Sequence, residues 1–76
     1  MDFVNINGTY HIILDEITIN NKKYVYLAAE NSPLNVLIKK IVIENGKEYL
    51  DGLDTDDEVI NALDIYYQKH KEEIGQ

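Results

Sequence analysis

Two Asn-Gly dipeptides, Asn7-Gly8 and Asn45-Gly46, constrain this chain more than any other feature of its sequence. Each lies between stretches rich in β-branched and aromatic residues. Both central residues of a type I′ hairpin turn need positive φ, which asparagine and glycine adopt at little cost. Asn20-Asn21 predicts a third hairpin, because asparagine also tolerates the left-handed conformation. Turns at this spacing predict an antiparallel β-meander over the first two-thirds of the chain.

The apolar residues after the first turn change phase partway along. Ile12 and Leu14 have one parity along a strand, whereas Ile17 and Ile19 have the other. Since side chains alternate with a period of two, an unbroken strand would place the two pairs on opposite faces. We therefore predict a β-bulge or a strong bend at Asp15-Glu16, which would return both pairs to one face.

The stretch over residues 24–29 alternates tyrosine with aliphatic residues and predicts the next strand. Residues 30–33 then break the pattern and contain the only proline of the chain, Pro33. Proline and its polar neighbours are typical of a connection between elements. We expect this segment to be the longest connection and a mobile loop.

The last third of the chain changes to helical spacing, which predicts an amphipathic helix over about residues 56–71. Thr55 and Glu58 match a capping box at its start. The acidic residues of the first turn suit the positive end of the helix dipole. We predict one core between the apolar face of the sheet and five helix residues: Val59, Ile60, Leu63, Tyr66 and Tyr67. The other face of the sheet is predicted to be partly solvated.

The length of 76 residues allows one domain, over residues 1–76. The predicted fold class is α+β, with four to five strands within about residues 2–52 and one C-terminal amphipathic helix packed on the sheet. Exposed edge strands make a weak homodimer an alternative to a monomer.

The order of these segments also resembles a known family. Residues 3–8 (FVNING), residues 14–27 (LDEITINNKKYVYL) and residues 36–43 (VLIKKIVI) follow the same order as in small acidic bacterial proteins catalogued as domain of unknown function 1292. The resemblance runs nearly end to end. It implies a bacterial, cytoplasmic protein with no assigned activity, and it supplies no functional residues.

The chain carries 14 acidic and 7 basic side chains, all of the latter lysine, for a net charge of -7. Such a charge repels phosphate backbones and disfavours direct binding of nucleic acid. There is no cysteine, which excludes disulfides, zinc-thiolate sites and thiol nucleophiles and fits a cytoplasmic setting. No apolar run approaches the ~20 residues that span a bilayer, so no membrane partner is expected.

No arrangement of catalytic or ligating residues stands out, so we predict neither an enzyme nor a cofactor nor a metal. His11 is predicted on a strand surface, and His70 is predicted to complement the C-terminal end of the helix dipole. The acidic cluster around Asp54 invites a calcium hypothesis. An EF-hand loop needs glycine at its sixth position, and counting from Asp51 or Asp54 places Asp56 or Val59 there. Weak cation binding is therefore only a minor alternative to helix capping.

The chain has six tyrosines, one phenylalanine and no tryptophan. The simpler interpretation packs the tyrosines between sheet and helix with their hydroxyls reaching water. The alternative is an exposed aromatic patch that anchors a protein partner. The candidate partner surface combines tyrosines with nearby carboxylates: Tyr24, Tyr26, Tyr49, Tyr66, Asp54, Asp56 and Asp57.

Three classes of function remain open. The leading hypothesis is a non-catalytic protein-binding, adaptor or regulatory domain that recognises another protein through its sheet face or edge. The second is an acidic inhibitor or nucleic-acid mimic that occupies the basic groove of a nucleic-acid enzyme. An enzyme is the third, and the absence of any site constellation weighs against it.

Overall fold

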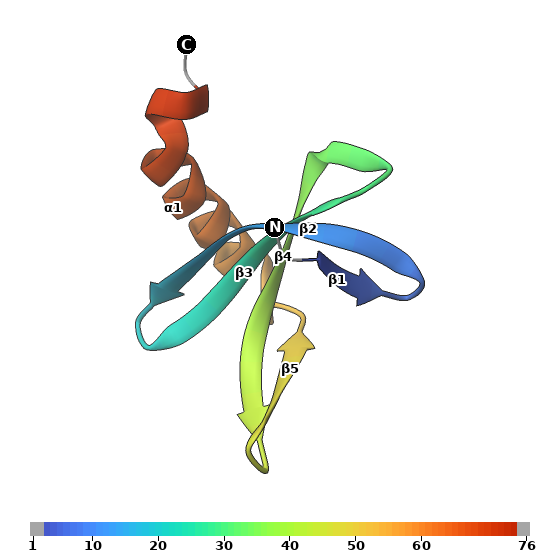
Figure 1. The fold of residues 1–76 in the computed structure, drawn as a ribbon. Helices are drawn as coiled ribbons and strands as arrows, with labels where there is room; N and C mark the ends of the chain where they lie inside the picture. Colours follow the sequence, from blue (N-terminus) through green and yellow to red (C-terminus); the bar gives the residue numbers. More distant parts are fainter. Residues whose placement is uncertain (1–2, 75–76) are drawn as a thin grey trace.

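The computed structural model describes residues 3–74, with the side chains of residues 32–34 and 72–74 excepted. Five antiparallel strands form one sheet in the order β1-β2-β3-β4-β5, followed by one helix (Figure 1). The elements are β1 (Phe3–Ile6), β2 (Thr9–Ile19), β3 (Lys22–Ala29), β4 (Ser32–Glu44), β5 (Lys47–Asp51) and α1 (Asp56–Ile74). The predicted α+β meander with a C-terminal helix is confirmed.

The three predicted hairpin turns all have positive φ at both central residues. The φ angles are 52° and 86° at Asn7-Gly8, 50° and 66° at Asn20-Asn21, and 51° and 76° at Asn45-Gly46. These are the signs that a type I′ turn requires, and its twist matches that of the flanking strands. Each turn therefore fixes the register of the hairpin that it closes.

The phase change in β2 is absorbed by a bulge at Leu14. Ile13 and Asp15 pair with neighbouring residues of β3, so that Leu14 is the extra residue. Asp15 and Glu16 both keep partners on β3, and the predicted position of the bulge was wrong by one residue. The bulge at Leu14 directs the carboxylate of Asp15 toward α1, where it finds ion-pair partners. Ile12, Ile17 and Ile19 share one face, as the phase change had indicated, whereas Ile13 lies on the other face.

The segment around Pro33 is not a long loop. Glu30 and Asn31 alone make the turn between β3 and β4. The pairing between these strands then skips residues 33–35, which bulge from the ladder. Proline has no backbone N–H to donate, so it is tolerated where the ladder is interrupted. The longest connection between elements is instead residues 52–55, between β5 and α1.

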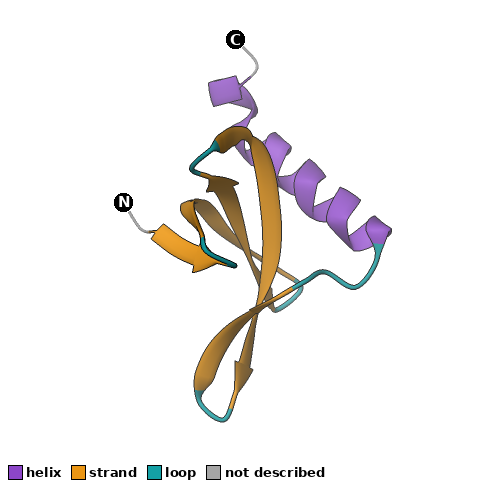
Figure 2. Ribbon diagram, turned by 90° about the vertical axis from the view of Figure 1, so that its right-hand side faces the viewer, coloured by secondary structure: helices purple, strands orange, loops and turns teal. Residues whose placement is uncertain are grey.

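α1 lies along one side of the sheet, which we call the helix face (Figure 2). Tyr24 and Tyr26 of β3 point to this side and form a core with Ala62 and Tyr66 of α1. The rings of Tyr26 and Tyr66 are stacked, with centroids 4.8 Å apart and planes at 19°. Tyr26 is fully buried, at 0% exposure. This stack is the centre of the contact between helix and sheet.

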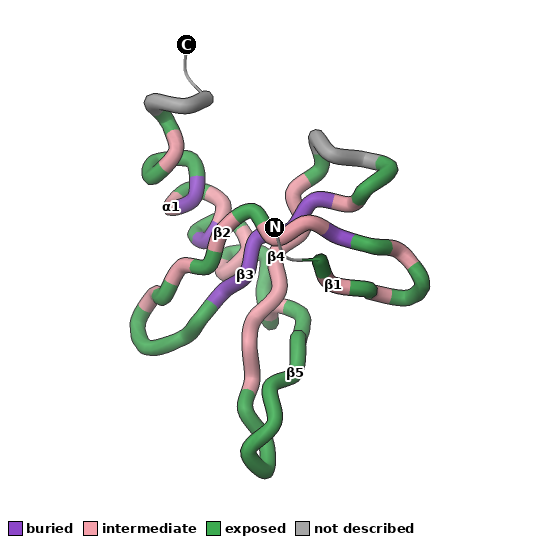
Figure 3. The backbone as a smooth tube through the Cα atoms, in the orientation of Figure 1, coloured by how far each residue is buried: buried purple, intermediate pink, exposed green. Residues whose placement is uncertain are grey.

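The opposite face of the sheet is also buried at its centre. Val25 and Leu27 alternate with the core tyrosines and so point away from α1, yet both are buried (Figure 3). The sheet curls strongly around them, and residues from both edge strands, Val4 and Leu50, line one hollow on this side. The opposite face is thus partly solvated, as predicted, with exposed residues such as Glu16 and Leu50, and the curl of the sheet buries its centre at β3.

α1 begins at Asp56, as predicted, and continues to Ile74, three residues beyond the predicted end. The hydroxyl Oγ1 of Thr55 accepts a hydrogen bond of 3.1 Å from the backbone N–H of Glu58. The Glu58 carboxylate accepts from the N–H of Asp54, at 2.7 Å, rather than from that of Thr55. The cap is therefore a capping box whose return bond is shifted by one residue.

Candidate partner surface

Three of the tyrosines predicted for the partner surface belong to the core. Tyr24, Tyr26 and Tyr66 are buried between sheet and helix, so that part of the predicted surface is wrong. Their hydroxyls were expected to reach water. The Tyr26 hydroxyl instead donates to the backbone carbonyl of Ala62 at 2.9 Å, and the Tyr24 hydroxyl donates to Glu58 at 2.5 Å. Because α1 supplies acceptors at the right depth, these rings can be buried without losing their hydrogen bonds.

The start of α1 is tied to β3 and β4 by a polar network. The Nζ atom of Lys40 lies 3.0 Å from a carboxylate oxygen of Asp54 and 3.6 Å from one of Glu58. The hydrogen bond to Glu58, together with burial, raises the pKa of Tyr24 to about 12. The hydrogen bonds from Tyr24 and from the amide of Asp54 lower the pKa of Glu58. Tyr24 therefore stays neutral at physiological pH, and the network serves to hold the helix.

A second ionic contact joins the other end of α1 to β2. The Asp15 carboxylate lies 2.8 Å from Nζ of Lys69 and 2.7 Å from Nε2 of His70. Burial acts to raise the pKa of Asp15, but the hydrogen bonds from Lys69 and His70 together lower it. The His70 ring also packs against Tyr66, with centroids 4.5 Å apart. The predicted role of His70 at the helix terminus is wrong, because its side chain turns toward the sheet.

The other histidine is also not where it was predicted. His11 is buried, and its Nδ1 lies 3.0 Å from the carbonyl oxygen of Thr9. It pairs with Ala29 and shares the face of Val25 and Leu27, so the sheet separates it from His70. Among the described side chains of residues 3–71, no three histidines or carboxylates are close enough together to hold a metal ion.

The outward side of α1 carries a regular stripe of exposed residues at alternating intervals of three and four. We call it the outer stripe: Asp57, Ile60, Asp64, Tyr67 and Lys71. Ile60 is 63% exposed and Tyr67 is 48% exposed. Their predicted place in the core is wrong, because α1 meets the sheet through Ala62 and Tyr66 instead.

A sequence signal for this stripe existed. Asp57 and Asp64 lie three or four residues from Ile60, and Asp64 lies three residues from Tyr67. The buried residues Ala62 and Tyr66 have only one carboxylate, Glu58, three or four residues away from either of them. Residues three and four apart lie on the same side of a helix. Aligning the carboxylates first would therefore have placed these two apolar side chains on the water side.

The negative charge is concentrated in one part of the chain. Residues 48–64 contain seven of the 14 acidic side chains and no lysine, while the rest contains the other seven together with all seven lysines. We call residues 48–64 the acidic segment. Its carboxylates come from β5, the connection and the first half of α1: Glu48, Asp51, Asp54, Asp56, Asp57, Glu58 and Asp64. The whole net charge of the chain therefore lies in this segment.

Of the residues predicted for the partner surface, the carboxylates and one tyrosine remain accessible. Asp54, Asp56 and Asp57 are exposed. Tyr49, on the edge strand β5, is 49% exposed. The carboxylates adjoin the outer stripe through Asp57, whereas Tyr49 belongs to the sheet edge. The structure thus divides the predicted surface between the exposed start of α1 and the edge strand β5.

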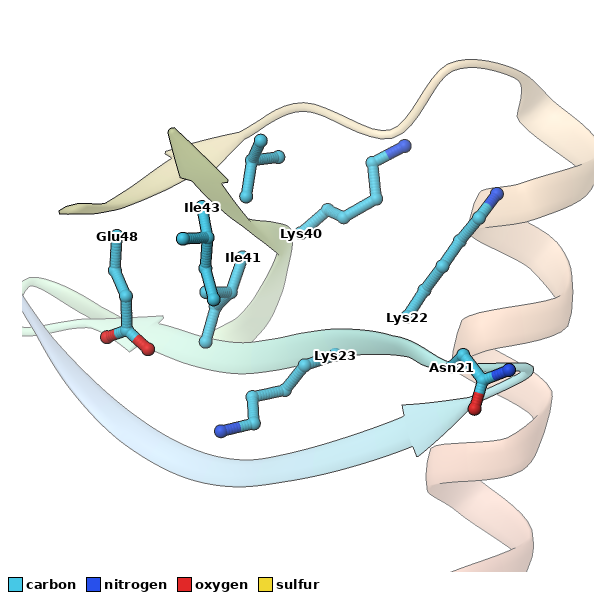
Figure 4. Close-up of a pocket in the computed structure, with 8 residues that line it drawn as sticks. Asn21, Lys22, Lys23, Lys40, Ile41, Ile43 and Glu48 are labelled. Atoms are coloured by element: carbon cyan, nitrogen blue, oxygen red, sulfur yellow. The ribbon is translucent and has the colours of Figure 1, made fainter. Parts of the chain in front are cut away.

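Three lysines, Lys22, Lys23 and Lys40, line an open hollow of about 420 Å³ between β3 and β4. Figure 4 shows Lys22 and Lys40 extending toward α1, while Lys23 extends the other way. Lys23 lies 3.6 Å from Glu16, and Lys40 is engaged by the network at the helix start. The three amino groups therefore do not converge as an anion site would require.

Comparisons with protein-family models, with curated proteins and with solved structures give no match. The resemblance to the family catalogued as domain of unknown function 1292 stays a prediction. None of the helical structure within residues 3–74 has both the length and the apolarity that crossing a membrane demands.

Proposed function

We propose that this chain is a non-catalytic, cytoplasmic protein-binding domain and that the outer stripe of α1 is its recognition surface. The observation that carries the proposal is the exposure of Ile60 and Tyr67 in line on a helix that already buries another face. Apolar side chains grouped on a surface are typical of sites that bind proteins. Tyrosine is also among the residues that most often dominate binding energy at interfaces.

The charges around the stripe define the chemistry of the partner. Asp57 and Asp64 flank Ile60, and the acidic segment leads up to them along the chain. Opposite charge on a partner would speed its association and select its orientation. The partner that fits is therefore a protein surface with an apolar centre and a basic rim.

Affinity capture from extract at low and at high salt tests this proposal. The double variant Ile60→Ser/Tyr67→Ser should fold normally and lose the specific partners that the wild-type chain retains. The matched control is Tyr10→Ser, which changes a similarly exposed tyrosine on β2. Loss of the same partners from both variants, or from neither, would contradict recognition by the outer stripe.

A second candidate function is an acidic inhibitor that mimics nucleic acid, and the concentration of charge in residues 48–64 favours it. Such a protein would bind the basic groove of a nucleic-acid enzyme, and its affinity would fall steeply with salt. The variant Asp56→Asn/Asp57→Asn/Asp64→Asn should weaken this binding. Neutralising Glu30 and Glu44, outside the segment, should change it little. A captured partner that binds its nucleic acid and this chain at once would exclude mimicry.

A further inference from the structure

The free edge of β5 offers a second interaction surface, separate from the outer stripe. All five residues of β5 are exposed, and the β4–β5 hairpin projects from the rest of the molecule in both ribbon views (Figures 1 and 2). An edge strand presents backbone N–H and C=O groups that can pair with another strand. The adjacent Ile43 is 67% exposed, which leaves apolar surface beside this edge.

The turn determines which backbone groups face outward. Glu44 and Lys47 are paired across the two-residue turn, and the residues of a pair that closes such a turn exchange both backbone hydrogen bonds. Bonded and non-bonded pairs then alternate along the ladder. The N–H and C=O groups of Tyr49 therefore face β4, and those of Glu48 and Leu50 face away from the sheet.

We propose that β5 pairs with the β5 of a second copy of this chain, antiparallel, about a two-fold axis at Tyr49. In this register Tyr49 lies opposite Tyr49 of the second copy, and Lys47 lies opposite Asp51. The outward groups of Glu48 bond to those of Leu50 of the second copy. A surface that is its own complement is what a two-fold dimer requires.

The charges of β5 favour this register over its neighbours. With the axis at Tyr49, both ends of the strand bring a lysine opposite a carboxylate, which stabilises cross-strand pairs. An axis at Glu48 would place that carboxylate opposite itself. An axis at Leu50 would leave Lys47 beyond the pairing. Only the axis at Tyr49 pairs every residue of β5, from Lys47 to Asp51.

Asp51 can take part without giving up its local contact. One of its carboxylate oxygens accepts a hydrogen bond of 2.9 Å from the N–H of Gly52, and the side chain is exposed. The second oxygen can accept from Lys47 of the other copy. Lysine on an edge strand usually discourages pairing. Here the facing carboxylate turns it into an attractive contact that is specific for this register.

The proposal predicts a weak dimer. Each copy carries a net charge of -7, so the measurement belongs near 0.15 M salt, where the Debye length is about 8 Å and repulsion beyond the contact is screened. Sedimentation equilibrium up to about 1 mM protein covers the range in which such small interfaces associate. The wild-type chain should dimerise, and Glu48→Pro, which removes one outward N–H, should dimerise at least tenfold more weakly. Glu48→Ala keeps that N–H and is the matched control.

Charge reversal tests the register itself. Lys47→Asp and Asp51→Lys each place like charges opposite one another, and each should weaken self-association at least tenfold. Mixing the two variants restores opposite charges at both positions, so the mixture should dimerise where neither variant does alone. A wild-type chain that stays monomeric at about 1 mM, or single variants that associate as the wild type does, would overturn the proposal. Neither result bears on the outer stripe, which lies on α1.

Discussion

The inward and outward sides of α1 carry similar residues in different environments. Tyr66 and Tyr67 are neighbours in sequence, yet the first is stacked on Tyr26 and the second is 48% exposed. The inward side is held by stacking and by the ionic contacts at both ends of the helix. On the outward side, Ile60 lies between Asp57 and Asp64, and Tyr67 lies between Asp64 and Lys71. A substitution on the inward side should therefore cost stability, and one on the outward side should cost binding.

The largest expected effect is the loss of the stacked ring. Tyr66→Ala should lower the free energy of unfolding by about 3–5 kcal/mol, as is usual when a large buried aromatic side chain is truncated. Urea unfolding followed by circular dichroism measures it. Tyr67→Ala is the matched control and should cost no more than about 1.5 kcal/mol, because its exposed ring touches the core only through an edge contact with Tyr66, at 5.7 Å between centroids. Equal losses of unfolding free energy in the two variants would contradict the proposed difference between the sides of α1.

A smaller loss is expected from overfilling the same contact. Ala62 is buried against the core tyrosines. Ala62→Leu should destabilise the fold by about 1–3 kcal/mol, because the packed site has no room for three more carbons. Asn61→Leu changes the adjacent exposed residue and should leave the urea midpoint nearly unchanged. If Ala62→Leu is as stable as the wild type, α1 packs less closely than described.

The helix cap should matter less than the core. Thr55→Ala removes the acceptor for the N–H of Glu58 and should cost about 1 kcal/mol. Thr55→Ser keeps the hydroxyl and should recover most of that stability. Thermal unfolding of the three proteins provides the comparison. Equal melting temperatures for Thr55→Ala and the wild type would show that the cap contributes nothing.

One effect is visible only at high pH. The pKa of Tyr24 is raised to about 12, while unfolded tyrosine titrates near 10. The neutral hydroxyl thus contributes stability below pH ~10, and that contribution disappears as the pH rises through ~12. Burial also raises the pKa of Tyr26, so an absorbance titration should show more than one late-titrating tyrosine, of which one moves toward 10 in Glu58→Gln. If it keeps its high pKa in that variant, burial alone would be the cause.

Local chemistry made much of the fold predictable. Asparagine and glycine specify positive φ within two residues, so all three hairpin turns follow from the sequence. The helix start follows from Thr55 and the acidic first turn. The position of the bulge does not, because parity reveals that one residue is extra but not which one. The bulge falls at Leu14 because Asp15 then faces α1 and bonds to His70, which lies 55 positions away in the chain.

The candidate surface was harder to predict for the same reason. Whether Tyr66 or Tyr67 faces the sheet depends on the rotation of α1 about its axis, and that rotation is set by Tyr24 and Tyr26 on a distant strand. Hydrophobicity alone favours burying both. His70 was misplaced likewise, because its partner Asp15 lies 55 positions away in the chain. His11 bonds to Thr9, only two residues away, and it was misplaced because its burial depends on the curl of the sheet.

Photo-crosslinking at position 67 tests recognition by the outer stripe most directly. A benzoylphenylalanine in place of Tyr67 keeps an aromatic ring at an exposed site, and the same replacement of Tyr10 is the control. Irradiation in cells should give a covalent adduct of defined mass from position 67 and none from position 10. An adduct from position 10 with none from position 67 would contradict the proposal that the outward side of α1 binds the partner.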